Sequence, residues 1–99
     1  MFRKKREEKG LLLRQVAAVT ELDQAIISRI ENGERLPTKE QVLKLAGLYG
    51  LNPEKTLTDW LSEKIVREYG DMPFASRAIS MAQERINYNS RMNKDKDII

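Results

Sequence analysis

One short segment of the chain gathers side chains with hydrogen-bonding chemistry on one face of a predicted helix. That face consists of Gln24, Ala25, Ser28 and Arg29. The apolar residues Ile27 and Ile30 fall on the other side at helical spacing. Gln, Ser and Arg side chains can hydrogen-bond base edges or phosphates in the major groove of DNA. The segment therefore has the residue types expected of a helix that reads DNA.

The sequence also marks both ends of this helix. Asp23 precedes it, and a carboxylate there can accept hydrogen bonds from free backbone N–H groups at the positive end of the helix dipole. Gly33 follows it and can take the left-handed conformation that ends many helices. We therefore expect one helix over residues 24–32.

Similar signals divide the rest of the chain into helices, and no stretch has the alternation of a strand. The further helices are expected at residues 2–9, 12–19, 39–49, 53–69 and 73–88. Thr38 and Gln41 have the spacing of a capping box, and Gly50 closes the helix that they begin. The expected fold class is all-α, with a compact five-helix part followed by a two-helix extension.

This pattern also suggests how the chain is organised. The first domain is expected at residues 1–57 and the helical extension at residues 58–88. Residues 89–99 are polar and alternate lysine with aspartate near their end, which is typical of a flexible tail.

Composition narrows the chemistry that the chain can perform. Its 99 residues are 40% apolar and 33% charged, with a formal charge of +3, so charge alone does not identify a polyanionic partner. There is no cysteine and no histidine, which leaves only carboxylates and lysines as candidate catalytic groups. We therefore expect no enzymatic activity, no metal and no cofactor. No apolar run is long enough to span a membrane, and no apolar core of a signal peptide follows the basic N-terminus, so a cytoplasmic protein is expected.

An ordered set of residues resembles the phage-repressor-like helix-turn-helix regulators of the Cro/C1 (XRE) family. The set comprises Arg6, Glu7, Glu8, Lys9, Gly10 and Leu11, then Val16 and Ala17, then Ile27 through Gly33, then Pro37, and finally Leu45, Ala46 and Gly50. It covers about residues 2–57. The resemblance implies a lambda-repressor-like DNA-binding domain in which the helix at residues 24–32 enters the major groove.

The resemblance also implies roles for particular residues. Base contacts fall on Gln24 and Arg29, and Ala25 and Ser28 face the same groove. Gln suits adenine and Arg suits guanine, which agrees with these positions. Phosphate contacts are expected from Arg14, Gln15, Asn32, Arg35 and Lys39. The alternative for all of these residues is an ordinary solvated surface.

Three further features follow from the comparison with this family. Arg6 and Glu31 are expected to form a structural ion pair between the first and third helices. Leu12 and Leu13 stand near the start of the second helix, where the family often has a polar residue that binds phosphate. Glu21 stands where the family usually has glycine in the turn, so we expect a wider turn.

The extension carries more apolar side chains than two appended helices can bury in a small domain. These residues are Trp60, Leu61, Ile65, Phe74, Ile79, Met81 and Ile86. One interpretation is a homodimer interface, because a dimer reads a palindromic operator with half-sites about 34–36 Å apart. The other is that they extend the core of the monomer.

The leading functional hypothesis is therefore a sequence-specific, dimeric transcriptional regulator that acts as a repressor or autoregulator on double-stranded DNA. Roles in a phage, a toxin–antitoxin pair or a restriction–modification operon are all compatible with the sequence. The alternative is an antitoxin or other protein-interaction module that binds a toxin or another protein through its C-terminal helices, with DNA binding secondary.

Overall fold

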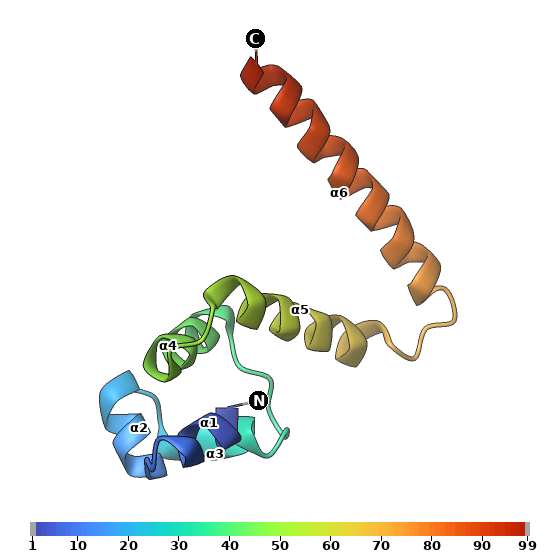
Figure 1. Ribbon diagram of the computed structural model, residues 1–99. Coiled ribbons are helices and arrows are strands. Elements are labelled where there is room, and N and C mark those ends of the chain that lie inside the picture. The colour runs from blue at the N-terminus through green and yellow to red at the C-terminus, as the bar shows by residue number, and fades with distance from the viewer. Residues whose placement is uncertain (1, 99) are drawn as a thin grey trace. The chain divides into compact units, whose positions relative to one another are not determined.

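The computed structural model describes the backbone of residues 2–98 and the side chains of residues 2–93, and within this range the chain is entirely helical (Figure 1). The helices are α1 (Phe2–Glu8), α2 (Leu13–Thr20), α3 (Gln24–Glu31), α4 (Lys39–Tyr49), α5 (Pro53–Tyr69) and α6 (Ala75–Ile98). The expected all-α class is confirmed. Two compact units, Met1–Lys64 and Ile65–Ile99, divide the chain within α5, beyond the boundary predicted after residue 57.

The predicted capping residues begin and end the helices of the first unit. The Asp23 carboxylate accepts a hydrogen bond of 2.7 Å from the backbone N–H of Ala25. Thr38 Oγ1 accepts from the backbone of Gln41 at 3.2 Å, and the Gln41 side chain accepts from the backbone of Thr38 at 3.0 Å. Gly50 ends α4 in the left-handed conformation with φ 65°. The capping box predicted before α4 is therefore confirmed.

The turn between α2 and α3 is tight although it lacks glycine. Glu21 follows α2 directly and takes φ 59°, the left-handed conformation. The prediction of a wider turn was therefore wrong. The hydroxyl of buried Thr20 donates to the carbonyl of Val16 at 2.7 Å, and this oxygen lies 3.4 Å from the backbone N–H of Leu22. These bonds hold the chain on both sides of Glu21, so the turn tolerates a strained residue.

Replacing Glu21 with glycine should therefore raise the free energy of unfolding by up to about 1 kcal/mol, because glycine takes a positive φ without steric cost. Chemical denaturation of the full chain measures this change. Ala18→Gly, on an exposed position inside α2, is the matched control and should lower stability by about 0.5–1 kcal/mol. A Glu21→Gly variant that loses as much stability as the control would contradict strain at this turn.

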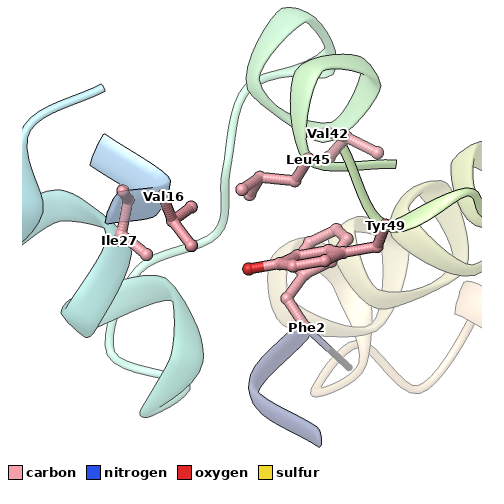
Figure 2. Packing of buried hydrophobic residues seen from close by; sticks show 6 residues of the cluster. All are labelled: Phe2, Val16, Ile27, Val42, Leu45 and Tyr49. Carbon is pink, nitrogen blue, oxygen red and sulfur yellow. The ribbon is translucent and has the colours of Figure 1, made fainter. Parts of the chain in front are cut away.

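The core of the first unit lies among α1, α2, α3 and α4. Its buried residues are Phe2, Val16, Ile27, Val42, Leu45 and Tyr49 (Figure 2). The Phe2 and Tyr49 rings stack with centroids 6.1 Å apart, which joins α1 to α4. Ile27 is only 1% exposed and is the residue by which α3 is anchored in this core. Burying a side chain of this size stabilises the fold by about 1.5–3 kcal/mol.

Tyr49 leaves one polar atom of this core unsatisfied. Its hydroxyl is buried and has no hydrogen-bond partner among the described residues, and Figure 2 shows it pointing into the cluster. Burial raises the pKa of Tyr49 above its ordinary value of 10.0, with the Glu31 carboxylate acting in the same direction. The folded protein therefore keeps the phenol neutral at a pH where the unfolded chain releases its proton.

Tyr49→Phe should raise the free energy of unfolding by about 1 kcal/mol at neutral pH, because it removes a buried hydroxyl that lacks a partner. It should also remove part of the alkaline instability. Because the pKa of Tyr49 is higher in the folded state, the stability of the unmodified chain falls as the pH rises above 10.0. Denaturation curves at neutral and alkaline pH measure both effects. A steeper alkaline loss in the variant would contradict this account.

Trp60 belongs to the first unit and packs against its core. Its indole Nε1–H donates to the carbonyl of Pro37 at 2.7 Å, and the Lys64 ammonium lies 5.4 Å from the centre of its ring. Trp60 therefore fits the second interpretation of the apolar residues after residue 57, in which they enlarge the core of the monomer. Leu61, in contrast, is 49% exposed.

The last helix is longer than the sequence indicated. The flexible tail over residues 89–99 stays a prediction, but the backbone of α6 continues past the expected end at Tyr88 to Ile98. The physical reason is that neither proline nor glycine follows Pro73, and so nothing interrupts the helix. Residue 99 and the side chains of residues 94–98 lie outside the described part of the chain.

No helix in the described part of the chain combines the length and apolarity that a membrane crossing requires. No group of three or more acidic, histidine or cysteine side chains in this range is arranged to hold a metal ion.

Candidate nucleic-acid interface

The candidate interface is built on α2 and α3, which lie side by side and are joined by the tight turn (Figure 1). α3 directs Ile27 into the core and leaves its other face open. On that open face Gln24, Ala25 and Arg29 are exposed, and Ser28 is partly buried. These are the four residues for which base contact was predicted, and one short helix presents them together.

A nearly buried ion pair fixes α3 to α1. Arg6 Nε and Nη2 donate to the two carboxylate oxygens of Glu31 at 2.8 and 3.0 Å, and Arg6 Nη1 donates to the carbonyl of Leu11 at 3.0 Å. The side chains of Arg6 and Glu31 are 13% and 4% exposed. This is the pair that the family resemblance implied. Its two-pronged geometry sets both the position and the rotation of α3.

The surroundings of Arg6 keep its guanidinium charged. The hydrogen bond to Glu31 raises the pKa of Arg6 above its already high ordinary value, and the negative charges of Glu31 and Glu7 act in the same direction. Arg6 therefore remains a cation wherever the protein is folded. With both partners engaged, this arginine serves the fold and leaves DNA contacts to other residues.

The remaining cations near α2 and α3 are not neutralised by the protein. Arg14, Arg29, Arg35 and Lys39 are all exposed. None of these four residues takes part in the ion pairs found among residues 2–93. The pairs at the N-terminus join Arg3 to Glu7, Lys5 to Glu8 and Arg6 to Glu31. Unpaired cations beside a helix of this kind are suited to binding phosphate.

The segment after α3 is also held in place. The backbone N–H groups of Glu34 and Arg35 both donate to the carbonyl of Arg29, at 2.9 and 3.3 Å. Pro37 is buried, and the Trp60 indole bonds to its carbonyl. Trp60 therefore positions the segment that carries Arg35, a role that the sequence analysis missed. Nothing in the sequence signals a contact between residues so far apart.

The start of α2 shows how the chain manages without the usual polar residue. Leu12 is 51% exposed. The side-chain oxygen of Gln15 accepts a hydrogen bond of 2.8 Å from the backbone N–H of Leu12, so Gln15 caps α2. Its side-chain nitrogen still provides a donor, and Arg14 beside it is exposed. Both stay candidates for phosphate contact.

Asn32, the last predicted contact on this helix, is exposed directly after α3. Its backbone N–H donates to the carbonyl of Ser28 at 3.0 Å, which continues the α-helical pattern of hydrogen bonds by one residue. The phosphate contact of its side chain stays a prediction.

Comparison with known proteins gives one match. The family model HTH_3, described as helix-turn-helix, matches residues 2–55, which include α1 to α4 and the start of α5. The curated proteins and the solved structures gave no match to this chain.

Proposed function

We propose a function for this chain, which belongs to the Cro/C1-type helix-turn-helix family of DNA-binding regulators. It acts as a homodimeric repressor or autoregulator on palindromic DNA. The observation that carries the proposal is the open face of α3. It presents Gln24, Ala25 and Arg29 to solvent while Ile27 and the Arg6–Glu31 pair hold the helix from behind.

Each group on this face has a role in the proposed complex. Gln24 pairs with adenine and Arg29 with guanine, and the Ala25 methyl group contacts a thymine methyl group. Ser28 is partly buried and bonds a base edge or a phosphate. These contacts choose the sequence that the protein binds.

Cationic and amide side chains around α3 fix the domain on the sugar–phosphate backbone. In this proposal Arg14, Gln15, Asn32, Arg35 and Lys39 contact phosphates. Such contacts strengthen binding to every sequence alike. A dimer bound in this way covers its site and excludes other proteins from the same DNA, which is the simplest form of repression.

Selection of bound duplexes from a random-sequence library tests the proposal with the full chain. We expect a palindrome whose half-site centres lie about 34–36 Å apart. The logarithm of affinity should fall against the logarithm of salt concentration with a slope of about 0.9 for each phosphate contacted. If no sequence is enriched and weak binding disappears at modest salt, the proposal is wrong.

A further inference from the structure

The second unit contains an apolar groove between the end of α5 and the first half of α6. Its lining consists of Ile65, Tyr69, Met72, Phe74, Ala75, Ala78, Ile79 and Ala82, and its volume is about 320 Å³. Where α5 ends beside it, a Cβ atom on Gly70 would overlap the carbonyl oxygen of Val66 one helical turn earlier, so glycine suits this position. Along α6 the floor of the groove is made largely of alanine, which leaves room for larger side chains.

This unit has no core of its own in the part that the structure describes. From residue 65 to residue 93 no side chain is buried, and only Ile65 and Ala75 are even partly covered. The exposed large apolar side chains are Val66, Tyr69, Met72, Phe74, Ile79, Met81, Ile86, Tyr88 and Met92. A helix as polar as α6 gains most of its stability from packing its apolar face against something else. The groove and α6 therefore require a partner.

The spacing of residues on α6 indicates which partner fits. Ala75, Ile79, Ala82 and Ile86 follow one another at intervals of four, three and four residues, which places them in one line along the helix. Two such helices that lie antiparallel bring Ile86 of each copy against Ala75 of the other, and Ile79 against Ala82. Every layer then pairs a large side chain with a small one, as close packing requires. In a parallel pair alanine would face alanine and leave a void.

Position and charge favour the same partner. Tyr69, Met72, Phe74 and Ile79 line the groove and Ile86 continues the line along α6, so an antiparallel copy covers these five exposed side chains together. Residues 65–99 contain six Lys or Arg and five Asp or Glu, so this unit is nearly neutral. Two copies therefore do not repel each other, and no excess charge selects an acidic or basic partner.

We propose that the groove is the docking site for a second copy of this chain, with α6 of each copy lying antiparallel in the groove of the other. The inference rests on the proposed function for the use of the dimer, and it adds the surface, the orientation and the residues. It also separates Trp60, which serves the first unit, from the contact between copies.

Two matched substitutions test the groove in the full chain. Ala82→Arg places a charged side chain on the floor of the groove, and Gln83→Arg places the same side chain on the polar face next to it. Arginine is a good helix former, so neither change should disrupt α6 itself. Sedimentation should show a dimer for the unmodified chain and for Gln83→Arg. Ala82→Arg should dissociate at about 100-fold higher concentration, because the groove cannot solvate the charge.

The orientation has its own test because the chain contains no cysteine. An oxidised mixture of Ala75→Cys and Ile86→Cys chains should form the mixed disulfide, whereas Ala75→Cys alone should not cross-link. Cross-linking of Ala75→Cys alone would mean parallel helices and would overturn the proposal. So would a monomeric unmodified chain, which would leave the groove to a different protein, or equal dimerisation of the Ala82→Arg and Gln83→Arg variants.

DNA binding separates this proposal from the proposed function. If the dimer depends on Ala82 but the chain selects no DNA sequence, the docking site stands and the regulator proposal fails. If the chain selects a palindrome but the Ala82→Arg variant still dimerises, the regulator proposal stands and the docking-site proposal fails.

Discussion

Glu31→Ala is expected to lower the free energy of unfolding by about 3–5 kcal/mol, because it leaves the Arg6 guanidinium uncompensated in a nearly buried position. The carboxylate accepts two of the three hydrogen bonds that Arg6 donates, and the Arg6 side chain is only 13% exposed. Water cannot replace those bonds without opening the contact between α1 and α3. Urea denaturation followed by circular dichroism measures the loss.

Two controls show whether the effect comes from the buried pair. Glu7→Ala removes an exposed carboxylate that lies 3.4 Å from Arg3, and it should change stability by less than about 0.5 kcal/mol. Replacing both partners, Arg6→Met with Glu31→Leu, should recover most of the loss because no buried charge remains. If the double variant is as unstable as Glu31→Ala, the cost lies in packing and our assignment is wrong.

The same pair has a consequence for DNA binding. Because α3 is short and its inner face is anchored mainly by Ile27 and Glu31, a change in either residue shifts every group on the outer face together. Loss of the pair should therefore weaken binding to every sequence, whereas loss of a base contact relaxes preference at one position. This difference separates residues that position the helix from residues that read DNA.

Local features of this fold were predictable from sequence because their causes are local. Asp23 and Thr38 begin helices through bonds to residues two or three positions away, and Gly50 ends one through its own backbone freedom. The fold around α3 followed from an ordered set of residues across the first domain. The open face of α3 followed from helical spacing alone.

The predictions that failed concern features that depend on contacts between distant residues or on small differences in free energy. Glu21 accepts a strained backbone because Thr20 and its neighbours fix the turn, and spacing does not reveal such bonds. Trp60 bonds to Pro37, twenty-three positions away in the chain, so an apolar residue in the extension looked free for an interface. The length of α6 was underestimated because polar composition near residue 89 was given more weight than the absence of a helix breaker. The groove depends on how α5 and α6 meet, which no periodicity describes.

Arg29→Ala is the second large effect that we expect. A bidentate arginine–guanine contact contributes about 1–3 kcal/mol of discrimination, and the dimer makes it at both half-sites, so affinity for the selected operator should fall by about 2–6 kcal/mol. Arg29 is exposed and forms no ion pair among the described residues, so its loss should leave folding almost unchanged. Fluorescence anisotropy with the selected duplex and with duplexes altered at single positions measures both affinity and preference.

The pattern of the loss identifies what Arg29 contacts. A base contact predicts that preference disappears at one position in each half-site while the salt dependence of binding changes little. A phosphate contact predicts an equal loss on all duplexes and a salt slope lower by about 0.9 per half-site, which is the result expected of Arg35→Ala. Arg77→Ala, on the exposed polar face of α6, should change neither quantity. If Arg29→Ala behaves as Arg35→Ala does, then Arg29 does not read a base, and Gln24 and Ser28 must carry the sequence preference.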